Sequence, residues 1–250
     1  QKNQLMMRKT SILFLILTLS FLPTLSMSQP QVTYYLSWSE PETHTLHIRV
    51  EAPANDQGYT DFQLPRWRPG RYILQDYAAA VSNVAGLWGD ELMRVEKMDN
   101  SRWRVHHKGK SGKVSLEYDY YANVTDAGSS VYDENMVYIN PVNCMMYVPE
   151  LIDEPVELYA TTLDNSLKIA SQLQQDADNH QHFLADSYHD LADSPTIFSE
   201  NITQFAFEES GVTYRLHFAG NYGAEPGDEK ALIDMLRPTI REQAAVFGGV

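Results

Sequence analysis

The histidines are the residues of this sequence best suited to holding a catalytic metal, and their spacing argues against it. A catalytic zinc site built on a helix uses two histidines at i and i+4 with a glutamate between them as general base. No His-Glu-x-x-His run occurs in the 250 residues. Two pairs of histidines point to opposite faces of expected strands and cannot chelate jointly. These pairs are His44 with His47 and His106 with His107. His180 and His182 share a face, but no third ligand is near them in the sequence, which favours a solvated polar edge.

The other chemical motifs are equally incomplete. Gly109-Lys110-Ser111 lacks the glycine that a phosphate-binding loop needs five residues earlier, where Arg104 stands, and no Gly-x-Ser-x-Gly nucleophile motif occurs. The single Cys144 cannot form an internal disulfide and is interpreted as a small buried apolar residue. An acid-rich cluster around Tyr188 is interpreted as a solvated turn, with cation or amine binding as the alternative. Its members are Asp186, His189, Asp190 and Asp193. The sequence therefore predicts no catalytic, cofactor-binding or metal-ligating residue in this chain.

The segment Leu64 to Tyr72 is the densest one without a chemical explanation. Pro65 and Pro69 fix the backbone on either side of Trp67, and Gly70 permits a sharp turn. Three arginines stand here in an otherwise acidic chain, which suggests a basic or cation–π corner. The preferred interpretation is a stiff connection between sheets with Trp67 packed as a plug. The alternative is a contact with another domain.

The start of the chain predicts export. Arg8 and Lys9 precede an apolar run, Ile12 to Leu22, which is shorter than the roughly 20 residues that a membrane-spanning helix needs. Pro23 ends the run, and small residues follow it, so residues 1–28 are predicted to be a signal peptide cleaved before Gln29. An uncleaved anchor is the alternative. We expect a periplasmic or extracellular protein with no stable membrane insertion after cleavage.

The charge balance excludes one class of partner. The whole chain has 19 Lys and Arg against 33 Asp and Glu, a net charge of −14. Cleavage of residues 1–28 removes three of the 19 basic residues and no acid, which leaves a net charge of −17. A surface this acidic repels phosphate backbones, so nucleic-acid binding is not expected.

The rest of the sequence predicts a mainly β domain over residues 29–222, built as an antiparallel sandwich-like fold. Short runs of alternating or β-branched and aromatic residues recur about every ten residues. The predicted strands are Val32–Trp38, His44–Val50, Trp103–His107, Val114–Ala122, Val156–Thr161, Gln181–Leu184, Thr203–Phe207 and Val212–Phe218. The glycine-rich Lys108–Lys113 stretch predicts a hairpin between the third and fourth of these strands.

Helical periodicity begins only at Asp228. Ala231 to Phe247 forms an amphipathic pattern, in which Pro238 is expected to kink or split the helix. The chain stops directly after this pattern, so we interpret residues 223–250 as the start of a truncated second domain. The uncovered apolar face of the helix predicts a tendency to associate.

Several segments together resemble one family. The run Leu64-Pro65-x-Trp67-x-Pro69-Gly70-x-Tyr72, followed by Asp76-Tyr77 and Val81, is similar to the N-terminal region of the glycyl aminopeptidases. The remaining similar segments follow in matching order. They are Trp103-Arg104-Val105, the Val114–Ala122 strand, Tyr188 to Pro195 and the final helix with Phe247-Gly248-Gly249. The resemblance covers nearly all of the chain after the signal segment.

The resemblance also implies a domain arrangement, a cofactor and an activity that the residues alone do not indicate. Members of this family are zinc metallopeptidases in which an N-terminal β-domain packs against a thermolysin-like catalytic domain, followed by a PDZ domain. The zinc ligands lie in a His-Glu-x-x-His helix that has no counterpart in this chain, so 223–250 would be the first helix of the α-helical catalytic domain. The implied parent enzyme uses zinc and removes N-terminal residues from peptide substrates, with glycine preferred. Its catalytic and PDZ domains would be the partners of this chain, which alone should be inactive. The competing hypothesis is a free-standing exported β-sandwich module that binds peptide or glycan.

Overall fold

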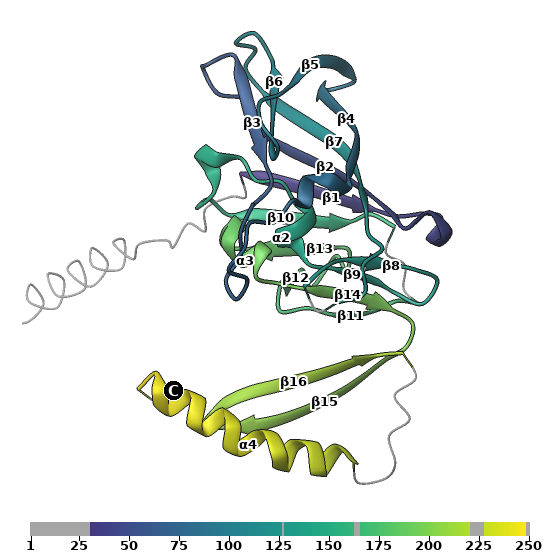
Figure 1. Cartoon of the computed structure of the whole chain (residues 1–250), viewed down its shortest axis with the longest axis vertical. Helices are drawn as coiled ribbons and strands as arrows, with labels where there is room; N and C mark the ends of the chain where they lie inside the picture. The colour runs from purple at the N-terminus through teal and green to yellow at the C-terminus, as the bar shows by residue number, and fades with distance from the viewer. Residues whose placement is uncertain (1–30, 127, 163–165, 221–227, 249–250) are drawn as a thin grey trace, which may run out of the picture.

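The computed structural model describes residues 31–126, 128–162, 166–220 and 228–248. The predicted signal peptide, 1–28, and the predicted domain change at 221–227 lie outside the described residues. In Figure 1 the larger sheets lie at one end of the molecule, while a hairpin and the C-terminal helix lie at the other.

The main element is a ten-stranded sheet with the order β12-β13-β10-β1-β2-β7-β4-β5-β6-β3. Its strands are β1 (Val32–Ser37), β2 (Thr45–Pro53), β3 (Tyr59–Gln63), β4 (Val81–Trp88), β5 (Glu91–Lys97), β6 (Arg102–His106), β7 (Lys113–Tyr121), β10 (Val156–Ala160), β12 (Gln174–Gln175) and β13 (His182–Ala185). Strands β1 and β10 run parallel and the other described pairs are antiparallel, so the sheet is mixed.

Two smaller sheets and a few helices complete the described structure. A four-stranded sheet has the order β11-β14-β9-β8, and β15 pairs with β16 as a separate hairpin. These strands are β8 (Val131–Tyr132), β9 (Val137–Ile139), β11 (Lys168–Ala170), β14 (Thr196–Ser199), β15 (Ile202–Glu209) and β16 (Val212–Ala219). The helices are η1 (Pro41–Thr43), η2 (Tyr77–Ala80), α2 (Pro141–Cys144), η3 (Pro149–Leu151), α3 (Tyr188–Ala192) and α4 (Asp228–Val246). The predicted fold class, mainly β with a C-terminal helix, is confirmed.

The predicted hairpin is wrong, and of the two outcomes expected at Pro238, a kink or a split, the split is excluded. Strands β6 and β7, on either side of the Lys108–Lys113 stretch, do not pair, because the β4–β5 hairpin lies between them in the sheet. The glycine-rich stretch instead contacts the chain near Gly58, where the backbone N–H groups of His107 and Lys108 donate to the Gly58 carbonyl. Pro238 does not split the C-terminal helix, since α4 continues through it from Asp228 to Val246.

The core forms on one face of the central strands. Alternate residues of β1, β2 and β7 are buried, as the period-two pattern requires. The largest fully buried side chains include Tyr34, Leu36, Leu46, Leu116 and Tyr118. A row of apolar side chains from three adjacent strands therefore closes this face against water.

Three buried tyrosines fasten the segment 144–146 to this core. The hydroxyl of Tyr118 donates to the Cys144 carbonyl at 2.6 Å, and that of Tyr188 donates to the Met145 carbonyl at 2.9 Å. The Tyr34 hydroxyl donates to the Met146 carbonyl at 2.9 Å, and the Met146 N–H donates to the Tyr118 oxygen at 3.0 Å. We call Tyr34, Tyr118 and Tyr188 the tyrosine clamp. Buried backbone polar groups need hydrogen-bond partners, and the clamp supplies those that a neighbouring strand would otherwise provide. Burial also raises the pKa of the Cys144 thiol to about 12, which makes it unreactive.

His107 makes the stability of the fold depend on pH. Its side chain is fully buried and contacts the Thr60 hydroxyl at 3.3 Å through Nε2, while Nδ1 has no partner among the described residues. Burial lowers the pKa of His107, with a further contribution from His106. In the unfolded chain the pKa of His107 is about 6.5. Below that pH the unfolded chain binds a proton at His107 that the folded chain does not, so the free energy of unfolding falls as the pH falls.

We expect acidification from about pH 7.5 to about pH 5.5 to lower the melting temperature, and His107→Gln to reduce that loss. The carboxyl groups with lowered pKa values, such as Asp99 and Asp126, respond only at more acidic pH. Thermal melts at the two pH values provide the measurement, and His180→Gln, at an exposed histidine, is the control. Equal pH dependence in the wild type and His107→Gln would contradict this assignment.

Candidate functional site

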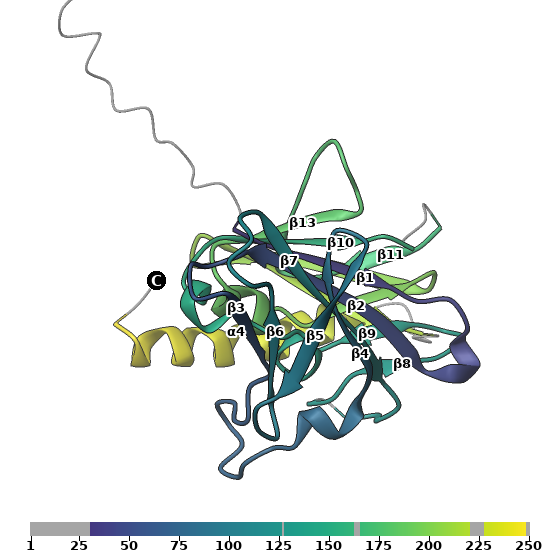
Figure 2. The ribbon, with the colours of Figure 1, turned by 90° about the horizontal axis from the view of Figure 1, so that it is seen from above.

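An exposed apolar loop connects β3 with η2. We call residues 64–75 the Arg-Trp loop. It begins at buried Leu64, turns at Gly70 with φ of 82°, and is closed where the Gln75 N–H donates to the Arg66 carbonyl at 2.8 Å. Figure 2 shows it extending away from the sheets at the lower edge of that view.

The tip of the Arg-Trp loop presents large apolar side chains to solvent. Trp67 is 50% exposed, so the interpretation of this residue as a packed plug is wrong. The neighbouring exposed side chains are Tyr72 (91%), Ile73 (65%) and Leu74 (69%). Four large apolar side chains exposed within eight residues are typical of a contact surface. This outcome favours the alternative, a contact with another domain.

Two arginines on either side of the turn at Gly70 anchor the Arg-Trp loop to a neighbouring segment. The Arg68 guanidinium packs on Gly128, where an added Cβ would lie 1.9 Å from its Nη2 atom, so a side chain at position 128 would displace the arginine. Arg71 lies 3.6 Å from the Asp126 carboxylate. Burial raises the pKa of the Tyr77 hydroxyl, and the charges of Arg68 and Arg71 oppose that rise. Two of the three arginines thus hold the loop in place and leave its apolar tip free.

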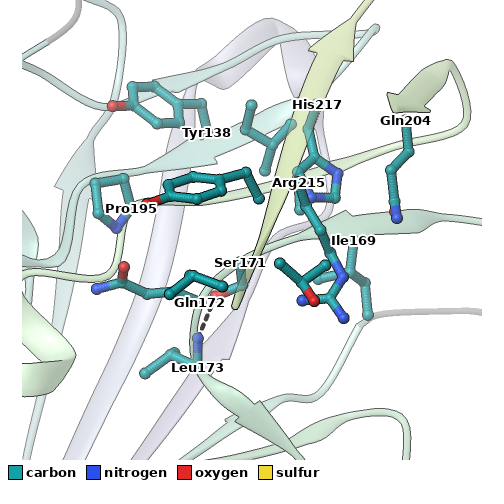
Figure 3. Close-up of a pocket in the computed structure, with 14 residues that line it drawn as sticks. Tyr138, Ile169, Ser171, Gln172, Leu173, Pro195, Gln204, Arg215 and His217 are labelled. Atoms are coloured by element: carbon teal, nitrogen blue, oxygen red, sulfur yellow. Dashed lines mark hydrogen bonds between the residues drawn. The ribbon is translucent and has the colours of Figure 1, made fainter. Parts of the chain in front are cut away.

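A second surface feature is a cleft of about 860 Å³ between the four-stranded sheet and the β15–β16 hairpin (Figure 3). The residues that line it are Tyr138, Ile169, Ala170, Ser171, Gln172, Leu173, Pro195, Ile197, Gln204, Val212, Thr213, Tyr214, Arg215 and His217. The four-stranded sheet with its neighbouring segments forms one side of the cleft and the hairpin forms the other, and both sides carry apolar and polar side chains. Among these residues there is one arginine and one histidine, but no Asp or Glu.

The hairpin wall of the cleft is held from behind by α4. The Glu209 carboxylate accepts hydrogen bonds from Arg237 at 2.6 Å and from Arg241 at 2.7 Å. These two guanidinium groups lower the pKa of Glu209 to about 2. The Arg237 guanidinium also lies 5.1 Å from the centre of the Phe207 ring. These contacts join α4 to the hairpin, while Met235 of α4 and Phe247, which follows α4, remain exposed.

Four of the histidines considered as metal ligands have other partners. His47 contacts Asp119 at 2.6 Å, His106 contacts Glu96 at 3.1 Å, and His44 contacts the Tyr132 carbonyl at 2.6 Å. His182 lies between the Asp176 and Glu157 carboxylates, at 2.9 Å and 3.0 Å, with its ring stacked on Tyr159. His180 is exposed. Over the described ranges, no three or more His, Cys, Asp or Glu side chains are grouped so that they could hold a metal ion.

The acid-rich cluster around Tyr188 is part of a helix start. Ser187 caps α3 by accepting the Asp190 N–H at 3.2 Å, and its hydroxyl donates to the Asp190 carboxylate at 2.7 Å. His189 lies 3.7 Å from Asp153 at the surface.

Sequence reasoning identified neither the cleft nor the tyrosine clamp, because each unites segments that are far apart in the chain.

The described residues form a β-rich domain with an exposed apolar loop and a surface cleft. Residues 33–200 match the Peptidase M61 N-terminal domain, and the chain belongs to this family. The resemblance to the glycyl aminopeptidases is thereby confirmed.

One solved structure shares the fold of this chain. An aminopeptidase N family protein from Idiomarina loihiensis is 20% identical with a TM-score of 0.76, and the match covers 88% of this chain and 37% of that one. An M1 zinc metallopeptidase from Deinococcus radiodurans is 15% identical with a TM-score of 0.41, covering 85% of this chain and 53% of that one. A search of curated proteins found no match. This chain thus spans little more than a third of the Idiomarina protein.

The described helices include none with the length and apolar character needed to cross a membrane.

Proposed function

We propose that this chain is the non-catalytic N-terminal part of an exported zinc metallopeptidase. The observation that supports the proposal is the family match over residues 33–200 in a chain whose described residues contain no metal-binding group. The parent enzyme would be an aminopeptidase that prefers N-terminal glycine. Its zinc, with the water that attacks the peptide carbonyl, would be held by a catalytic domain outside residues 33–200.

Within that enzyme the chain would supply structure rather than chemistry. We assign residues 29–222 to the N-terminal β-domain and residues 223–250 to the start of the catalytic domain. The Arg-Trp loop would contact the catalytic or PDZ domain, because its apolar tip is exposed while two of its arginines anchor it. The basic and apolar segment at the start of the sequence supports export to the periplasm or the extracellular space.

Sequencing the gene beyond the codon for Val250 tests the proposal. We expect the reading frame to continue into a helix with His-Glu-x-x-His and then into a PDZ domain. A reading frame that ends without that motif would remove the enzyme hypothesis and leave the free-standing binding module.

A further inference from the structure

We propose that the cleft between the four-stranded sheet and the β15–β16 hairpin binds the carboxylate of a short apolar peptide, with Arg215 as its cationic partner. This inference rests on the geometry of the cleft and is independent of the proposed enzyme function.

The charge of the cleft differs in sign from that of the chain. The protein has 33 acidic residues and a net charge of −14, yet none of the fourteen residues that line the cleft is acidic. Arg215 is exposed, and no described residue forms an ion pair or hydrogen bond with its side chain. The nearby Glu208 carboxylate accepts from the Thr213 hydroxyl instead. A guanidinium without an ion-pair partner among the described residues is suited to a carboxylate, which it can bind through two parallel hydrogen bonds.

Two polar groups lie beside Arg215 on the hairpin. The strand register places Gln204 directly opposite His217, and Figure 3 shows both side chains on the same side of the hairpin as Arg215. The Nδ1 atom of His217 is buried and lacks a partner among the described residues. Burial, with the charge of Arg215, lowers the pKa of His217, so its ring is neutral at neutral pH. The histidine and the glutamine amide can therefore serve as hydrogen-bonding groups beside a single positive charge.

The opposite wall determines the rest of the ligand. Pro195 and Ile197 contribute apolar surface to the cleft, with Tyr138 directly opposite Ile197 in the strand register. A cleft of about 860 Å³ lies within the size range of small-ligand sites. A peptide of two or three residues with apolar side chains and a free C-terminal carboxylate matches both walls.

The test compares two probes by isothermal titration calorimetry on the 250-residue chain. The probes are the peptide Ala-Leu-Leu and the same peptide with a C-terminal amide. We expect the free acid to bind about tenfold or more tightly than the amide, because a hydrogen-bonded charge is lost in the amide. Arg215→Gln should weaken binding of the acid by a similar factor and leave the weak binding of the amide unchanged.

Arg94→Gln is the matched control, because Arg94 is an exposed strand arginine on β5 that pairs with Glu96. It should bind the acid as the wild type does, and thermal melts should confirm that both variants are folded. Three outcomes would overturn the proposal: no binding of the acid by the folded wild type, equal binding of acid and amide, or unchanged binding in Arg215→Gln. None of these outcomes bears on whether the gene encodes a zinc site.

Discussion

Replacing Tyr118 with phenylalanine is expected to lower the free energy of unfolding by about 2–4 kcal/mol. The Tyr118 oxygen donates to the Cys144 carbonyl and accepts from the Met146 N–H, and the whole side chain is buried. Its removal leaves two buried backbone groups without partners, each at a cost of about 1–3 kcal/mol. For a chain of this size the melting temperature should fall by roughly 4–16 °C, measured by calorimetry or circular dichroism.

Tyr121→Phe provides the control for this change. Tyr121 ends the same strand but is 52% exposed, and its hydroxyl accepts a hydrogen bond from the Asn123 side chain. We expect an effect within about 0.5 kcal/mol, as at most surface positions. If Tyr118→Phe were as mild as Tyr121→Phe, the tyrosine clamp would not be a main support of segment 144–146.

The second large effect is expected in the full-length protein, at the tip of the Arg-Trp loop. Tyr72→Ala combined with Leu74→Ala should weaken the proposed contact between the β-domain and the rest of the enzyme by about 2 kcal/mol or more, as at interface hot spots. The same pair of changes in the 250-residue chain should alter its own stability by no more than about 0.5 kcal/mol, because both side chains are exposed there. The measurement is the melting temperature of each polypeptide with and without the two changes.

The contrast between the two polypeptides makes this prediction specific. Leu92→Ala is the control, because Leu92 is 74% exposed but lies on β5, away from the loop. Equal and small effects of the double change in both polypeptides would show that the Arg-Trp loop contacts no other domain. A large loss in the short chain would show that the loop supports the β-domain itself.

The sequence predicted where the strands lie along the chain better than it predicted which strands pair in the sheet. Alternation in Val32–Ser37 and Lys113–Tyr121 reports that one face is buried, and those strands form as expected. Pairing is a different property, because it depends on which strand packs beside which. The glycine-rich Lys108–Lys113 stretch has the composition of a hairpin, yet β4 and β5 lie between the two strands that it joins.

The functional surfaces were harder to predict. Trp67 lies between two prolines, and nothing in that local pattern distinguishes a buried plug from an exposed contact. The cleft unites Tyr138, Ile169 and Arg215, which come from three different strands, so no local motif reports it. The absence of a His-Glu-x-x-His run, in contrast, is a property of the sequence itself and needed no structure.

We propose that this chain is part of a zinc peptidase whose zinc is held by another domain. Metal analysis and release of glycine from a chromogenic glycyl amide test it when the 250-residue chain and the full-length protein are compared side by side. We expect one zinc ion per molecule and turnover for the full-length protein, with neither for the 250-residue chain. Stoichiometric zinc together with turnover in the 250-residue chain would contradict the claim.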